Sequence, residues 1–253
     1  METRVLGRTG FRVSALGLGT MTWGGDTDIY EARDQLQTYV EAGGSFVDTA
    51  DVYNDGHAEE ILGELAREHP DLVISTKAGA LRGQPSRNTS RGYLLSALDA
   101  SLRRLRRNHI DIWHVHTWDS GTPLDETLRA FDLAVASGKV RYVAVSNYSG
   151  WQLSAATMSQ NLKSSPATIS ATQVEYSLLQ RGIEREVIPA CSQLGVGVLA
   201  WSPLGRGVLT GKYRNGTPAD SRGASRNFAS FVSPFLDDRA RGIVEAVHLA
   251  AEA

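Results

Sequence analysis

The sequence predicts an α/β fold with a parallel sheet, because strand-like and helix-like patterns alternate along its 253 residues. Parallel neighbours need a long connection, and a right-handed helical crossover supplies it. The short apolar runs that predict strands lie at 13–19, 45–48, 72–76, 110–116, 140–146, 171–176 and 196–201. The amphipathic stretches that predict helices lie at 29–41, 58–68, 90–106, 124–136, 151–161, 183–194 and from 236 to the end.

Residues typical of helix ends support this division of the chain. Ser90 precedes an apolar stripe with helical spacing and predicts an N-cap. Gly43, Gly138 and Gly195 each follow a helical stretch, where a left-handed residue commonly ends a helix.

The start of the chain and one long connection fall outside the alternation. Residues 4–13 predict a β-hairpin with Thr9 and Gly10 at its turn, which is suited to closing the bottom of a barrel. Residues 211–234 form the only long irregular stretch, and such a loop inside a compact domain is usually functional. Because no linker or low-complexity segment divides the chain, we expect residues 1–253 to form a single domain.

Two architectures fit the alternation, an open doubly wound sheet and a (β/α)8 barrel of the TIM type. A dinucleotide-binding open sheet should show G-x-G-x-x-G after its first strand, but LGLGTMTWGG has its glycines at other spacings. Unusual polar residues instead follow several different strands, where barrel enzymes build their sites. The sequence therefore predicts a TIM barrel. Only seven strands are accounted for, so we expect the eighth strand–helix unit to be missing from this chain.

Composition excludes several classes of protein. Hydrophobic residues make up 42% of the chain and its net charge is -2, which argues against disorder and against a nucleic-acid partner. No apolar run approaches the roughly 20 residues that span a bilayer, and a signal peptide's apolar core is lacking at the N-terminus. Cys191 is the single cysteine and is expected to be a small buried side chain. These features predict a cytoplasmic protein without a membrane partner.

Three residues after neighbouring strands could together perform proton transfer. A tyrosine has a pKa near 10, which is too high for ready proton exchange near neutrality. A nearby ammonium lowers that pKa, and a carboxylate behind the ammonium holds it in place. Tyr53, Lys77 and Asp48 supply these three groups. His116, which ends the fourth strand, is suited to orienting a substrate oxygen or sharing the proton.

Further residues at the same strand ends suit a nicotinamide cofactor. Trp201 offers a flat aromatic face, while Asn147 and Gln173 offer amide hydrogen bonds to a carboxamide. Gly205 and Gly207 would let backbone amides approach a pyrophosphate closely.

Other polar and aromatic residues have competing interpretations. His114 and His116 point to the same face of one strand, and His114 is expected to be packed or hydrogen-bonded rather than catalytic. No carboxylate or cysteine completes a convincing ligand set with them, so no metal site is predicted. Trp23 and Trp118 follow strands and either line a substrate pocket or pack against loops. A Schiff-base role for Lys77 in an aldolase would leave the cofactor-type residues unexplained.

Several segments in order resemble the aldo-keto reductase family. They are LGRTGFRVSALGLGTMTWGG, FVDTADVYNDGHAEEILGEL, ISTKAG, IDIWHVH, SGKVRYVAVSNYS, QVEYSLLQR and LAWSPLGRGVLTGKY. The first and last of these resemble the branch that contains bacterial reductases and potassium-channel β subunits. Members of that branch continue with an eighth strand and helix, so the resemblance also implies that the natural protein is longer.

The resemblance implies a function and a set of site residues. Tyr53 would protonate the carbonyl of an aldehyde or ketone during reduction by NADPH, with Asp48 and Lys77 tuning it and His116 beside it. The residues implied to bind the cofactor are Thr20, Ser146, Asn147, Gln173, Trp201, Ser202, Leu204, Gly205, Gly207, Lys212 and Arg222. The alternative is a cofactor-sensing regulatory subunit of the channel type. His116 argues against it, because the channel subunits differ at that position.

Overall fold

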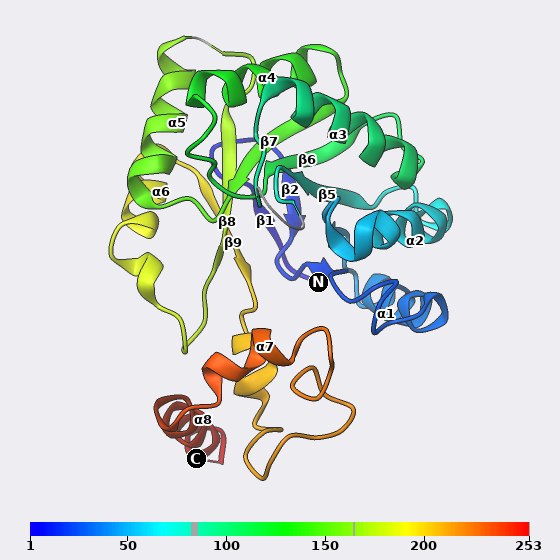
Figure 1. Cartoon of the computed structure of the whole chain (residues 1–253), viewed down its shortest axis with the longest axis vertical. Helices are drawn as coiled ribbons and strands as arrows, with labels where there is room; N and C mark the ends of the chain where they lie inside the picture. Colours follow the sequence, from blue (N-terminus) through cyan, green and yellow to red (C-terminus); the bar gives the residue numbers. More distant parts are fainter. Residues whose placement is uncertain (82–85, 164, 253) are drawn as a thin grey trace.

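A computed structural model of the chain describes residues 1–81, 86–163 and 165–252, and it contains the expected alternation of strands and helices (Figure 1). Seven parallel strands lie side by side in chain order within the described residues. They are β3 (Leu18–Gly19), β4 (Phe46–Asp48), β5 (Val73–Ala78), β6 (Ile110–Val115), β7 (Val140–Ser146), β8 (Ile169–Glu175) and β9 (Gly197–Trp201). The sheet curls into an incomplete TIM-like barrel, which confirms the predicted fold class.

Helices connect successive strands and cover the outer face of the sheet (Figure 1). They are α1 (Ile29–Glu41), α2 (His57–Leu65), α3 (Arg91–Leu105), α4 (Leu124–Ala136), α5 (Gly150–Leu162) and α6 (Val187–Leu194). The bounds of α1 and α4 are those predicted from the sequence. Gly43, Gly138 and Gly195 all have the expected positive φ. Ser90 occupies the N-cap position of α3, but its side chain makes no capping hydrogen bond.

The predicted first strand is divided between two sheets. Strands β1 (Thr3–Val5) and β2 (Arg12–Ser14) form an antiparallel hairpin, and only β3 joins the parallel sheet. At this break the Ser14 hydroxyl donates to the Leu16 carbonyl at 2.8 Å and accepts from the Phe46 amide at 3.1 Å, and the Tyr39 hydroxyl contacts the same two groups. The chain therefore turns between residues 14 and 18, where the sequence pattern predicts one continuous strand.

The hairpin closes the end of the barrel where the strands begin, as the sequence predicts. The Arg8 amide donates to the Gly195 carbonyl, just before β9, at 2.8 Å. Gly7 is so close to this end that a Cβ would lie 2.4 Å from the Ser170 carbonyl oxygen, and its φ is +55°. Phe11 stacks on Tyr142 of β7 with ring centroids 4.7 Å apart. The hairpin thus leaves open the opposite end of the barrel, where the strands finish.

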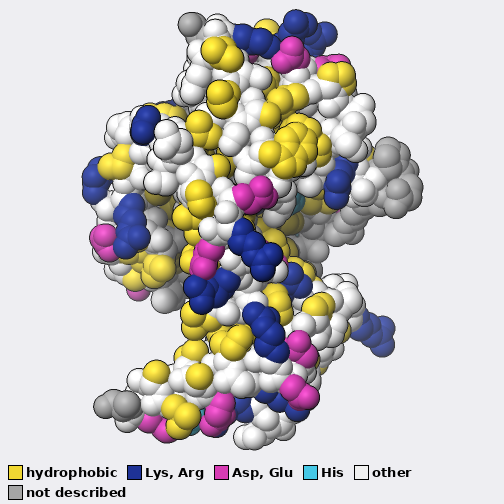
Figure 2. Space-filling model, turned by 90° about the vertical axis from the view of Figure 1, so that its left-hand side faces the viewer, with side chains coloured by type: hydrophobic (Ala, Val, Ile, Leu, Met, Phe, Trp, Pro, Cys, Tyr) yellow, Lys and Arg dark blue, Asp and Glu magenta, His cyan; other side chains and the backbone are white. Residues whose placement is uncertain are grey.

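The chain after β9 forms a separate packed group. Residues 211–234 are predicted to be irregular, but their end contains α7 (Ala229–Val232) and a 3-10 turn, Ser233–Phe235. Helix α8 (Asp238–Glu252) packs here through Val244 against Val208 and Val232. Figure 1 shows this group beyond the end of β9. Figure 2 shows lysine and arginine side chains on the surface where this group meets the barrel.

Candidate active site

Three of the predicted catalytic residues meet where the parallel strands end. Lys77, in β5, donates hydrogen bonds from Nζ to Asp48 Oδ2 at 2.6 Å and to the Thr49 carbonyl at 2.8 Å. A third, longer hydrogen bond of 3.5 Å runs from Nζ to the Tyr53 hydroxyl oxygen. The Lys77 side chain is 1% exposed and that of Asp48 is 16% exposed. The ammonium is therefore held between a carboxylate and the phenol, as the sequence predicts.

The two charged members of this group stabilise each other's ionised forms. Burial alone would raise the pKa of Asp48, yet the Lys77 ammonium and the hydrogen bonds to the carboxylate bring it below its usual value. Burial alone would lower the pKa of Lys77, yet Asp48 brings it above its usual value. Lys77 is thus a cation whose three donors are all engaged. A Schiff-base role would need a neutral amine, so this geometry disfavours an aldolase.

Tyr53 differs from the expectation in the direction of its pKa. The sequence predicts that Lys77 lowers it, but the pKa of Tyr53 is raised above its usual value in the structure. Burial of the phenol favours the neutral form, and it outweighs the opposing effect of the Lys77 ammonium. The hydroxyl therefore keeps its proton near neutral pH, as a proton donor must.

His116 lies directly after β6 and faces Tyr53. The two rings meet edge to face, with centroids 6.0 Å apart and planes at 80°. Burial, and then the nearby Lys77 charge, lower the pKa of His116 to about 3, so its imidazole is neutral. Its Nδ1 is buried without a hydrogen-bond partner among the described residues. A neutral imidazole ring beside the phenol is suited to a hydrogen bond with a small polar ligand.

Inside the barrel, a set of polar side chains joins Asp48 to two predicted cofactor residues. Asp48 Oδ1 accepts from Ser75 Oγ at 2.9 Å and from Gln173 Nε2 at 3.0 Å. Ser75 Oγ lies 3.0 Å from His114 Nε2, and Ser146 Oγ lies 3.4 Å from His114 Nδ1. The hydrogen-bonded role expected for His114 is confirmed. Sequence reasoning missed Ser75, whose only signal is a hydroxyl two residues before Lys77 on the same face of β5.

Asn147 and Trp201 form a second pair at the strand ends. Asn147 Nδ2 donates to the His116 carbonyl at 3.0 Å, and its Oδ1 accepts from Trp201 Nε1 at 3.0 Å. The positive φ of Asn147, 57°, places its side chain between these two partners. An amide has two N–H donors and two acceptor positions, so Asn147 and Gln173 each keep capacity for a further ligand.

The loop after β9 brings several predicted residues together. Ser202, Gly205, Arg206 and Gly207 all have positive φ, between 50° and 93°. Arg206 anchors the loop through two hydrogen bonds to Glu175, at 2.7 and 2.8 Å, and its guanidinium lies 5.7 Å from the Trp201 ring centroid. Arg206 was not predicted, and its sequence signal is only an arginine between the two glycines.

The remaining predicted residues are distributed between core and surface. Thr20 is fully buried and its hydroxyl donates to the Asp48 carbonyl at 3.2 Å. Leu204 is 57% exposed, and Lys212 and Arg222 are also exposed. Trp23 lies inside the core, where its Nε1 donates to Gln35 Oε1 at 2.9 Å.

The second predicted pocket tryptophan has a different environment. Trp118 is half-buried and makes edge contacts with Tyr148 and Trp151, at centroid distances of 5.2 and 5.3 Å. Trp151 is exposed, so this aromatic cluster reaches the surface. Cys191 is buried, as expected for a small core side chain.

A second buried charge cluster lies next to the segment between Asp48 and Tyr53. Glu59 is fully buried, accepts from Thr76 Oγ1 at 2.5 Å, and pairs with Arg104, whose Nε lies 2.7 Å away. Asp51 shares this region, and burial together with the Glu59 charge raises its pKa to about 7. A buried oxygen of Asp51, Oδ1, has no hydrogen-bond partner among the described residues.

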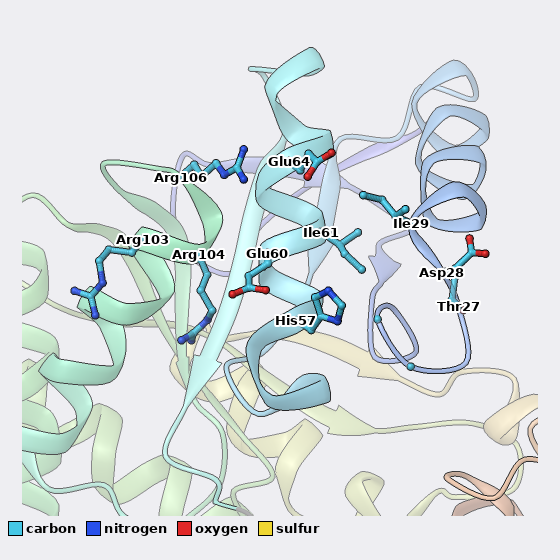
Figure 3. Close-up of a pocket in the computed structure, with 12 residues that line it drawn as sticks. Thr27, Asp28, Ile29, His57, Glu60, Ile61, Glu64, Arg103, Arg104 and Arg106 are labelled. Atoms are coloured by element: carbon cyan, nitrogen blue, oxygen red, sulfur yellow. The ribbon is translucent and has the colours of Figure 1, made fainter.

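A large cavity lies outside the barrel, away from the predicted site (Figure 3). Its volume is about 660 Å³, and it is formed by the start of α1, by α2 and by the end of α3. Its walls carry His57, Glu60 and Glu64 as well as Arg103 and Arg106. This cavity mixes both signs of charge and contains none of the predicted catalytic residues.

Residues 1–81, 86–163 and 165–252 lack two features of other protein classes, a cluster of metal ligands and a membrane-spanning helix. No group of three or more His, Cys, Asp or Glu side chains there could hold a metal ion. None of the helices in these ranges is long and apolar enough to cross a membrane.

Comparison with known proteins identifies the class to which this fold and site belong. The family model of the aldo/keto reductases matches residues 15–252, so the chain belongs to the aldo/keto reductase family. A probable voltage-gated potassium channel subunit beta of Oryza sativa is 37% identical, over 100% of this chain and 79% of that protein. The L-glyceraldehyde 3-phosphate reductase of Escherichia coli is also 37% identical, over 88% of this chain and 67% of that protein. An uncharacterized oxidoreductase of Bacillus subtilis, YrpG, is 40% identical, over 84% and 69% respectively. Family membership and these relatives support an oxidoreductase.

Proposed function

We propose that the chain is an NAD(P)H-dependent reductase of aldehydes or ketones in which Tyr53 donates the proton. The observation that carries this proposal is the position of Lys77 Nζ, hydrogen-bonded to both Asp48 and Tyr53. The phenol is neutral and therefore has a proton to give. The ammonium beside it stabilises the phenolate that remains, so the same group that binds Asp48 assists the transfer.

The neighbouring side chains support a carbonyl substrate at this position. A carbonyl oxygen that accepts from Tyr53 would lie beside His116, whose neutral imidazole offers a further hydrogen bond. Two donors directed at one oxygen polarise the carbonyl and stabilise the negative charge that develops on it. The aromatic cluster at Trp118 and Trp151 is suited to the apolar part of a small substrate.

The donor set fits a nicotinamide cofactor. The spare amide capacity of Asn147 and Gln173 matches a carboxamide, and the Trp201 ring matches an aromatic face. Gly205 and Gly207 have φ of +57° and +93°, a backbone conformation that favours glycine, and a loop without side chains at these two positions suits the approach of a pyrophosphate. When bound, a reduced nicotinamide supplies the hydride for the carbonyl carbon. The exposed Lys212 and Arg222 favour NADPH, whose extra phosphate is an anion.

Replacement of Tyr53 by Phe tests the proposal. Loss of a positioned proton donor is expected to lower kcat by roughly 10²–10⁴-fold with simple aldehydes. The affinity for NADPH, measured by the quenching of tryptophan fluorescence, should change little because the variant removes only the hydroxyl. The matched control is Tyr30→Phe at an exposed position of α1, which should keep full activity. Turnover by Tyr53→Phe at the wild-type rate would refute Tyr53 as the donor.

The relative from Oryza sativa favours a second candidate, a cofactor-sensing regulatory subunit, because its similarity covers 100% of this chain. The two functions differ in rate. A reductase oxidises bound NADPH at an enzyme-like rate when an aldehyde is added, whereas a sensor retains the reduced cofactor through many such additions. Single-turnover absorbance measurements with a panel of aldehydes and ketones separate them.

A further inference from the structure

His114 is a fully buried histidine at the centre of the barrel, two residues before His116. Its two ring nitrogens face two different serine hydroxyls: Nε2 lies 3.0 Å from Ser75 Oγ and Nδ1 lies 3.4 Å from Ser146 Oγ. Because Ser75 also bonds to Asp48, the four side chains form one continuous chain of hydrogen bonds. This chain links the group that binds Lys77 to a predicted cofactor residue.

The charge of Asp48 determines which group donates and which accepts in each of these hydrogen bonds. An ionised carboxylate can only accept, so the single hydroxyl proton of Ser75 is donated to Asp48 Oδ1, at 2.9 Å. Ser75 Oγ must then accept from its other neighbour, and the proton between Ser75 and His114 belongs to Nε2. A charge-assisted hydrogen bond is roughly twice as strong as a neutral one, which is why Asp48 determines the arrangement.

The protonation state of His114 then determines that Ser146 donates its hydroxyl proton to the ring. Burial, and then the Lys77 charge, lower the pKa of His114 to about 3, so the ring is neutral and carries one proton. With that proton on Nε2, Nδ1 is an acceptor and takes the hydroxyl proton of Ser146. The Ser146 oxygen then has only lone pairs to offer to any further partner.

A competing tautomer would reverse this order. The Val145 backbone lies within hydrogen-bond reach of the His114 ring, so a ring proton on Nδ1 is the alternative arrangement. In that tautomer Nε2 would have to take the Ser75 proton away from the Asp48 carboxylate. The exchange replaces a hydrogen bond to a charged group by one to a neutral group, so it is disfavoured as long as Lys77 keeps Asp48 ionised.

We propose that His114 is a positioning residue that holds the Ser146 hydroxyl as a pure acceptor, selecting ligands with an N–H donor such as a primary carboxamide. The identity of the ligand rests on the proposed function, whereas the hydrogen-bond direction does not. The primary amide of nicotinamide has the N–H groups that such an acceptor needs, and an acid or ester at the same position has none.

Nitrogen NMR of the cofactor-free protein tests the direction without any activity measurement. With 15N-labelled histidine, His114 should show a protonated Nε2 and an unprotonated Nδ1 throughout the neutral pH range. A proton on Nδ1 would overturn the proposal. If the expected tautomer is found but the protein reduces no carbonyl compound, the proposed function fails and the assignment of Ser146 as an acceptor stands.

Two substitutions test the consequence for binding. His114→Phe removes both ring nitrogens and is expected to weaken NADPH binding roughly tenfold, since the Ser146 proton is freed to compete with the ligand. His114→Gln can donate to Ser75 and accept from Ser146, so it should restore most of the affinity. His57→Gln, on the outer surface, is the matched control and should bind as the wild type does. Equal losses in both His114 variants would show a packing role only and would also overturn the proposal.

Discussion

Removal of the Lys77 ammonium is expected to destabilise the protein, independently of any effect on catalysis. The variant Lys77→Met keeps most of the side-chain volume but leaves the Asp48 carboxylate without its cation. Asp48 is 16% exposed, so water replaces little of what is lost. Its remaining donors are the Ser75 hydroxyl and the Gln173 amide, both of which are neutral groups.

The magnitude follows from the separation of the charges. At 2.6 Å and an effective dielectric constant of about 20, Coulomb's law gives an attraction of about 6 kcal/mol between unit charges. Desolvation of the two ions offsets most of this, so the net contribution of the pair is small. An ion left without its partner keeps its desolvation cost. We therefore expect Lys77→Met to lower the free energy of unfolding by about 3–5 kcal/mol, and Asp48→Asn to have a similar effect.

A double-mutant cycle measures the prediction. Urea unfolding at neutral pH of the wild type, Lys77→Met, Asp48→Asn and the double variant gives the coupling energy between the two residues. The double variant buries no unpaired charge, so it should be at least about 2 kcal/mol more stable than the sum of the single changes indicates. The matched control is the exposed pair Lys163 and Asp125, at 2.8 Å, which should show no resolvable coupling. Additive effects at Lys77 and Asp48 would refute the reasoning.

Two further predictions concern Asp51 and the loop between β9 and α7. The pKa of Asp51 rises from 3.8 to about 7 on folding. The folded state therefore retains a proton that the unfolded state loses, and stability falls as pH rises between these values, by at most about 4 kcal/mol. Asp51→Asn should thus exceed the wild type in stability by more at pH 8 than at pH 5 in urea unfolding, and an equal difference at both would contradict this. Asp26 accepts hydrogen bonds from Ser225 and, at 2.7 Å, from Asn227 Nδ2. Asp26→Ala should make that loop easier to cleave with trypsin than Asp34→Ala does, and identical cleavage rates would exclude a tethering role.

Much of the fold could be predicted because the signals for it are local. The bounds of β7, α1 and α4 agree with the prediction, since hydrophobic periodicity and helix ends are properties of neighbouring residues. The prediction of one continuous first strand was wrong at the position where the Ser14 hydroxyl bonds to residues about thirty positions away. The prediction that residues 211–234 are irregular was wrong at their end for a similar reason, because Val232 of α7 packs on residues far away in the sequence.

The same distinction applies to the candidate site, where some residues could be predicted from the sequence and others could not. Asp48, Lys77 and His116 could be found because each lies where a predicted strand ends, and parallel strands end at a common edge. Ser75 and Arg206 could not, since nothing local distinguishes them from ordinary polar residues.

The sequence by itself determined the order of strands and helices, the family, and which side chains reach the end of the barrel. Only the tertiary structure decided what those side chains do to one another. It set the raised pKa of Tyr53, the ionised pair of Lys77 and Asp48, and the hydrogen bonds of His114. The physical reason is that burial and charge interactions depend on distances between segments far apart in the chain, and these distances exist only after folding.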